Sequence, residues 1–291
     1  MSRPTDLILT ALAPAIWGST YFVTTEFLPQ GFPITLSVLR ALPAGLLLLL
    51  LVRQLPPRAW LGRVLLLGAF NFAIFWVLLF ISAYRLPGGV AATLGATQPL
   101  IVLLLARLVL GNQIRPLSVL VALAGLGGVA LLVLGPNAAL DPLGVAAGLG
   151  GAVSMAAGTV FSRKWQPPVP PLTFTAWQLT AGGLLLVPVA LIAEPMMPLP
   201  DARALGGLLY LGLIGAALTY LLWFRGIARI EPAAISMLGM MSPVTAVLLG
   251  WLALGQELSG LQTLGVLAVL GSVWLGQRAA RPAAAPHRAA A

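Results

Sequence analysis

Apolar residues run along this chain in stretches of about 20, the length that a helix needs to cross the hydrocarbon core of a bilayer. Short segments rich in proline, glycine and charged residues separate the stretches. The pattern therefore predicts an all-α integral membrane protein with ten transmembrane helices. Their expected ranges are 6–27, 33–52, 61–83, 88–110, 116–134, 143–162, 171–193, 204–226, 232–254 and 260–277.

The second half of the chain repeats the first. Residues 84–134 align without a gap on residues 228–278, at an offset of 144 positions, and Pro99 falls on Pro243. The second span aligns with the seventh at an offset of 138 positions. Glycine and proline positions match as well as the leucines do, so shared composition does not explain the alignment.

Each half contains five spans, and an odd number makes the two halves enter the membrane in opposite directions. Such inverted-topology repeats are characteristic of secondary transporters. The sequence thus predicts two inverted five-helix repeats, the N-terminal one over residues 1–137 and the C-terminal one over 138–278. Residues 279–291 are expected to form a disordered cytoplasmic tail.

The composition indicates that most of the chain is surrounded by lipid and not by water. Only 8% of the residues are charged and 59% are hydrophobic, whereas a soluble domain carries about 25% charged residues. There is no cysteine, and the single histidine, His287, lies in the Ala/Pro-rich tail. No Ser/His pair, carboxylate dyad or Gly-rich phosphate loop is present. The sequence therefore predicts no metal, no cofactor and no enzymatic activity.

We attribute the net charge of +9 to membrane topology and not to nucleic-acid binding, because the basic residues lie between apolar spans. With the N-terminus in the cytoplasm, only Arg85 and Arg203 fall on the opposite side, and Arg40 lies inside a span. This asymmetry places both termini in the cytoplasm. The cytoplasmic set is Arg3, Arg53, Arg58, Arg63, Arg107, Arg115, Arg163, Lys164, Arg225, Arg229, Arg278, Arg281 and Arg288.

Three features resemble the EamA branch of the drug/metabolite transporter superfamily over residues 6–278. They are Trp17-Gly18-Ser19 in the first span and two helix breaks, at Pro99 and Pro243, that precede Leu-Gly-Asn-Gln and Leu-Gly-Gln-Glu turns. The resemblance implies a monomeric secondary transporter in the bacterial inner membrane. It would export small neutral or aromatic amino acids and related metabolites by alternating access, with the bilayer and a small-molecule substrate as its partners.

A substrate site is expected near the membrane midplane, between the two halves. Thr93 and Thr97 lie one helical turn apart and share a face, and their repeat equivalents are Met237 and Met241. The alternative is that these small or flexible residues only let helices pack closely. The full set expected around the cavity is Trp17, Tyr21, Asn71, Phe75, Thr93, Thr97, Gln98, Phe161, Tyr220, Met237 and Met241.

Pro99 and Pro243 remove backbone donors inside apolar helices, and their symmetric placement favours hinges over tolerated kinks. Arg40 lies about 10 Å inside the second helix. It could grip a substrate carboxylate, extend towards the surface, or pair with Glu26; the neutral repeat equivalent, Gln178, favours a structural role.

Other functions fit less well. A multidrug exporter of lipophilic cations would use a buried carboxylate, and all seven acidic residues fall at span ends or in loops. A nucleotide-sugar-like exporter would use more midplane basic residues than Arg40 alone, and a membrane scaffold would not use converging polar residues. The acidic positions also predict no stoichiometric proton exchange through an intramembrane side chain.

Overall fold

A computed structural model describes residues 3–86, 94–133, 141–254 and 259–279. Every element in these ranges is helical, so the all-α expectation is confirmed for them. Thr93 and most of the expected tail, residues 280–291, lie outside the described residues.

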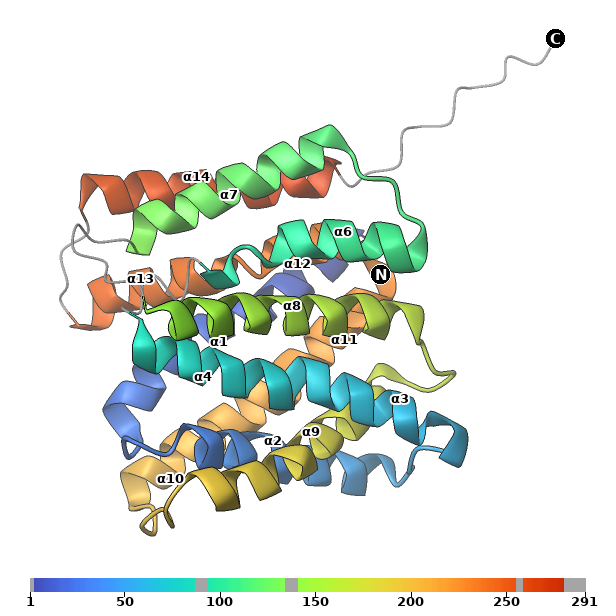
Figure 1. Cartoon of the computed structure of the whole chain (residues 1–291), viewed down its shortest axis with the longest axis vertical. Helices are drawn as coiled ribbons and strands as arrows, with labels where there is room; N and C mark the ends of the chain where they lie inside the picture. The colour runs from blue at the N-terminus through green and yellow to red at the C-terminus, as the bar shows by residue number, and fades with distance from the viewer. Residues whose placement is uncertain (1–2, 87–93, 134–140, 255–258, 280–291) are drawn as a thin grey trace.

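The first half of the chain forms seven helical segments (Figure 1) within its described residues. Three of these, α3, η1 and α4, follow one another directly and make one long helix with a π-helical middle. The bounds are α1 Arg3–Phe27, α2 Pro33–Val52, α3 Arg58–Gly68, η1 Ala69–Ala73, α4 Ile74–Arg85, α6 Gln98–Leu110 and α7 Pro116–Val133.

The second half forms eight segments in its described residues, and again one long helix, α10–η2–α11, has a π-helical middle. The bounds are α8 Pro142–Lys164, α9 Pro171–Ala193, α10 Ala202–Leu209, η2 Tyr210–Leu218, α11 Thr219–Arg229, α12 Pro232–Leu238, α13 Met241–Leu254 and α14 Gly260–Ala279.

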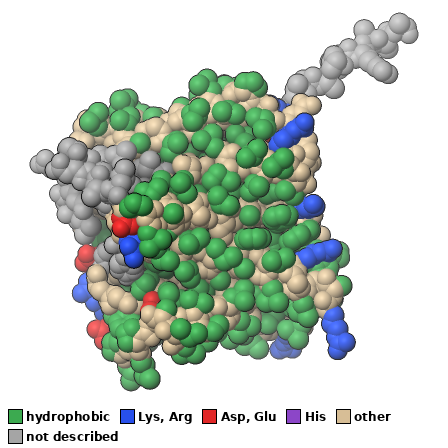
Figure 2. Space-filling view, in the orientation of Figure 1, with side chains coloured by type: hydrophobic (Ala, Val, Ile, Leu, Met, Phe, Trp, Pro, Cys, Tyr) green, Lys and Arg blue, Asp and Glu red, His purple; other side chains and the backbone are tan. Residues whose placement is uncertain are grey.

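Eight stretches of the described chain are long and apolar enough to cross a membrane. They coincide with the expected first to third and sixth to tenth spans. The expected fourth and fifth spans are covered by the shorter apolar helices 98–110 and 116–132. Hydrophobic side chains cover the broad face of the molecule (Figure 2), and residues such as Leu50 and Leu108, each more than 70% exposed, lie where lipid would contact them.

Local sequence explains where several helices begin. Proline opens α2, α7, α8, α9 and α12, because the first turn of a helix does not use the missing N–H. The Asp141 carboxylate accepts a hydrogen bond from the Gly144 N–H at 2.7 Å, and Asp201 caps α10 through Ala204 at the same distance. These caps satisfy donors that a helix cannot pair internally.

Helical continuity is lost just before Pro99 and Pro243. A turn at residues 96–97 precedes α6, and a turn at residues 239–240 separates α12 from α13. Both turns contain tight i to i−3 bonds, such as Thr97 N–H to the Leu94 carbonyl and Gly239 N–H to that of Ser236. A proline ring clashes with the carbonyl four residues earlier, so the break lies on the N-terminal side of each proline.

Helices α2 and α9 pack closely through two glycines. A Cβ added to Gly45 would lie 2.5 Å from the backbone nitrogen of Thr180, and one added to Gly183 would lie 2.8 Å from the Cα of Leu42. Helices α7 and α14 form a second close pair, at the other end of the view in Figure 1. Between these pairs, α1 packs on α11 and α13, while α8 packs on α4 and α6.

Candidate functional site

An aromatic cluster fills the interior between α1, the π-helical third span and α11. We define it as Trp17, Phe72, Trp76, Tyr220, Trp223 and Phe224. The Trp17 ring lies 4.9 Å from that of Tyr220 and 5.2 Å from that of Trp223, and the Phe72 ring lies 4.6 Å from that of Tyr220. Phe75 packs against the same core. The cluster thus contains Trp17 and Tyr220 of the expected site, and Phe75 lies beside it.

A chain of hydrogen bonds borders this cluster, which we call the Gly215 network. Trp17 Nε1–H donates to Thr219 Oγ1 at 2.9 Å, and Thr219 Oγ1 donates to the Gly215 carbonyl at 2.9 Å. Arg40 Nη2 donates to the same carbonyl at 2.6 Å. Gly215 belongs to the π-helical segment η2, and such segments occur frequently at functional sites.

A second polar group, the Asn71 cluster, consists of Asn71, Ser162 and Gln178, all fully buried. Asn71 Nδ2 donates to Gln178 Oε1 at 2.9 Å and to Ser162 Oγ at 3.2 Å. Asn71 Oδ1 and Gln178 Nε2 have no hydrogen-bond partner in the described part of the chain. The Asn71 side chain fits here because residue 158 is glycine; a Cβ at Gly158 would overlap Asn71 Oδ1.

The other expected residues lie apart from the aromatic cluster. Phe161 stacks against Phe70 and Trp165 at ring distances of 6.2 and 4.8 Å. Met237 packs in the core of α7, α12 and α14, and with Pro99 lines a cavity of about 10 Å³, just large enough for one water. The side chain of Tyr21 lies outside the described structure.

Three expected residues lie at the helix breaks. Thr97 Oγ1 donates to the Leu94 carbonyl at 2.6 Å and so stabilises the turn before α6. Gln98 Nε2 is buried without a hydrogen-bond partner among the described residues, and Met241 is half-buried at the start of α13. Their position at interrupted backbone fits either a hinge or a binding role.

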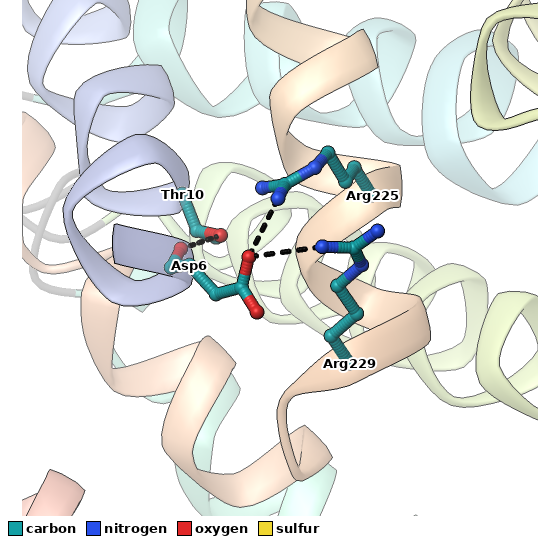
Figure 3. Close-up of polar contacts among 4 residues, drawn as sticks. All are labelled: Asp6, Thr10, Arg225 and Arg229. Atoms are coloured by element: carbon teal, nitrogen blue, oxygen red, sulfur yellow. Dashed lines mark hydrogen bonds and ion pairs between the residues drawn. The ribbon is translucent and has the colours of Figure 1, made fainter. Parts of the chain in front are cut away.

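An ion-pair cluster joins α1 to α11 at one end of the bundle (Figure 3). Asp6 Oδ1 lies 2.6 Å from Arg225 Nη2 and 3.1 Å from Arg229 Nη1, and the carboxylate points between the two guanidinium groups. Thr10 packs directly on Gly226, where a Cβ would overlap its side chain. These contacts hold the first span against the eighth.

A crevice of about 490 Å³ opens at the C-terminal ends of α6 and α8. Its lining is more polar than the interior and includes Asn112, Arg163, Lys164 and Glu231. Arg163 also donates to the carbonyl of Ile227 at 3.0 Å, which ties α8 to the end of α11. Because these groups lie at helix ends, the crevice is at one end of the bundle and not at its centre.

Sequence reasoning missed several residues of the interior. Trp76, Phe72 and Trp223 belong to the aromatic cluster, and Ser162 and Gln178 bind Asn71. A signal for the aromatic residues was available, because positions 72 and 76, and 220, 223 and 224, have the three- and four-residue spacings that share one helix face. No local pattern indicated the partners of Asn71.

Long apolar helices whose polar contacts face one another in the interior are typical of a multi-pass membrane protein. The model of the EamA-like transporter family matches residues 5–134 and again residues 142–276. The chain therefore belongs to the EamA-like transporter family.

Named relatives agree with this assignment. The chain is 45% identical to Protein PecM of Dickeya dadantii, over 91% of this chain and 90% of that protein. It is 31% identical to the uncharacterized inner membrane transporter YedA of Escherichia coli, over 89% and 86% of the two chains. A crystal structure with 21% identity superposes with a TM-score of 0.83 over 96% of this chain and 98% of that one, which shows a shared fold.

Proposed function

We propose that this protein is a secondary transporter that exports small neutral or aromatic amino acids and related metabolites across the bacterial inner membrane. It works by alternating access, as a monomer with both termini in the cytoplasm. The observation that carries the proposal is the aromatic cluster beside the Gly215 network. Flat apolar walls with a few oriented polar groups suit a small ligand that has an aromatic side chain.

The proposal includes ten spans arranged as two inverted repeats. The π-helical segments η1 and η2 fall in the third and eighth spans, and Asn71 and Gly215 within them differ by the repeat offset of 144. Gly45 contacts Thr180 while Gly183 contacts Leu42, and both pairs exchange under the offset of 138. The family model also matches the chain twice. A two-fold relation between the halves would account for all three observations.

The orientation follows the charges. Lys and Arg gather along the right edge of the molecule in Figure 2, whereas Asp and Glu lie at the left edge beside other basic groups. The edge with more Lys and Arg contains the chain segments assigned to the cytoplasm.

Transport is tested by counterflow of labelled tryptophan into proteoliposomes that contain the purified protein. We expect exchange with unlabelled tryptophan, and Trp17→Ala should slow it about tenfold or more, because it removes a ring and the hydrogen bond to Thr219. Trp251→Ala is the matched control, since Trp251 is 47% exposed on the lipid-facing side of α13.

Failure to exchange any neutral amino acid would contradict the proposal. The same vesicles loaded with a lipophilic cation or a nucleotide sugar then test the two alternative exporters. The chain contains no cysteine, so a single cysteine introduced at Arg58 reports the orientation of the inserted protein without background labelling.

Hinges at Pro99 and Pro243 are part of the proposed mechanism. Because each proline ends local helical bonding, alanine should restore continuity and stiffen the helix. We expect Pro99→Ala and Pro243→Ala to slow exchange more than they weaken tryptophan binding, since a stiffer hinge affects the conformational step. Counterflow rates and calorimetric affinities measured in parallel decide this. Wild-type turnover in both variants would show that the prolines are not hinges and only affect helix packing.

A further inference from the structure

Arg40 occupies an unusual place for a charged residue. It lies seven residues after the start of α2, about 10 Å into the span, and it is half-buried. Its Nη2 donates to the Gly215 carbonyl, and the guanidinium carbon lies 5.0 Å from the centre of the Trp76 ring. Intramembrane charges are costly and mark functional positions by default.

The repeat equivalent of Arg40 shows what this position requires structurally. Gln178 lies 138 residues later and binds Asn71, the equivalent of Gly215. A neutral amide therefore braces the π-helical segment in one half, as Arg40 does in the other. From sequence, the neutral equivalent favoured a structural role for Arg40. The contact with Gly215 fits that structural role, but the brace does not need a positive charge, so the charge of Arg40 calls for a further explanation.

The surroundings of Arg40 also differ from those of Gln178. A Cβ added to Gly215 would lie 3.6 Å from Arg40 Nη2, and one added to Gly212 would lie 3.7 Å from the Arg40 carbonyl, both ordinary contacts. Beside the Asn71 cluster, by contrast, a Cβ on Gly158 would overlap its neighbour. Gly212 and Gly215, beside Arg40, are therefore less tightly packed than Gly158 is, and Trp76 of the aromatic cluster lies against the Arg40 guanidinium.

We infer that Arg40 binds the carboxylate of the transported molecule, while the aromatic cluster receives its side chain. The inference rests on the proposed function and names the charged part of its substrate. A guanidinium fork offers two parallel donors to a planar oxyanion. Trp76 and the Gly215 carbonyl hold the fork in a fixed orientation, and the reduced dielectric of the interior strengthens the attraction. The substrate class is thus an aromatic or apolar compound that carries a carboxylate.

The test compares matched ligands that differ only in the carboxylate. Binding of tryptophan and tryptophanamide, and of indole-3-acetate and indole-3-acetamide, is measured by calorimetry and thermal shift on the full-length protein. Arg40→Gln copies the equivalent residue and keeps a donor for Gly215. We expect it to weaken carboxylate binding about tenfold or more and amide binding less than about twofold, with Arg40→Lys intermediate because lysine lacks the fork.

Arg63→Gln is the matched control, because Arg63 also stacks on a tryptophan, Trp60, but is exposed on α3. Equal carboxylate-to-amide ratios in wild type and Arg40→Gln would overturn the inference and leave Arg40 a brace. If Arg40→Gln does not fold, the same ratio in Arg40→Lys decides. If tryptophan shows neither binding nor counterflow, the proposed function fails, and the indole-3-acetate pair still decides whether Arg40 recognises carboxylates.

Discussion

Gly45→Leu is expected to lower the melting temperature of the purified protein by about 6–12 °C. The backbones of α2 and α9 meet at this glycine, and a Cβ would lie 2.5 Å from the Thr180 nitrogen. A backbone nitrogen cannot move aside as a flexible side chain can, so the helices must separate. Overpacking of this kind costs about 3 kcal/mol, and each kcal/mol corresponds to about 2–4 °C in a chain of this size class.

Gly183→Leu should have a similar effect, because Gly183 meets Leu42 on the other side of the same crossing. The matched control is Gly271→Leu in α14, where an added Cβ meets nothing within 4 Å. Thermal unfolding of detergent-solubilised protein measures all three variants. A Gly45→Leu protein as stable as Gly271→Leu would show that α2 and α9 do not pack through these glycines.

The second large effect is expected at the Asn71 cluster. Asn71→Leu removes the Nδ2 donor to Gln178 and Ser162 and leaves these two with only their mutual 3.5 Å contact, which should cost about 1–2 kcal/mol in the free energy of unfolding. The exchange rate should fall about tenfold or more, since alternating access would require the buried cluster to open and reform. The double variant Asn71→Leu/Gln178→Leu should regain most of the stability, because replacing both partners with apolar groups removes the unpaired amide.

The double variant separates stability from function. We expect it to remain slow in tryptophan counterflow although its melting temperature returns towards that of the wild type. Gln262→Leu is a suitable control, since it removes a half-buried amide near the start of α14, away from the Asn71 cluster. Wild-type exchange in Asn71→Leu would assign the cluster a packing role only.

Part of the candidate site could be predicted because its residues lie on regular helices. Trp17, Phe75 and Tyr220 were expected in the interior, and the aromatic cluster contains or contacts all three. Met237 and Phe161 were expected beside them but pack in other groups of residues. The direction in which a helical side chain points depends on the rotation of its helix, and periodicity in a nearly all-apolar span does not define that rotation.

Paired charges were equally hard to predict. Asp6 was expected to lie at a span end, and no partner was named for it; it binds Arg225 and Arg229, more than 200 residues away. Both the acid and the bases are visible in the sequence. Their pairing required the first helix to lie beside the eighth, which no local pattern states.

The sequence by itself determined that the chain is helical and lies in a membrane. In lipid, each span must satisfy its own backbone hydrogen bonds, so length and apolar composition are sufficient to predict helices. Only the tertiary structure decided that Asn71 meets Gln178, that Trp17 donates to Thr219 and that Arg40 braces Gly215. These contacts join helices far apart in the chain, and they depend on crossing angles and close glycine packing that arise only when the whole bundle assembles.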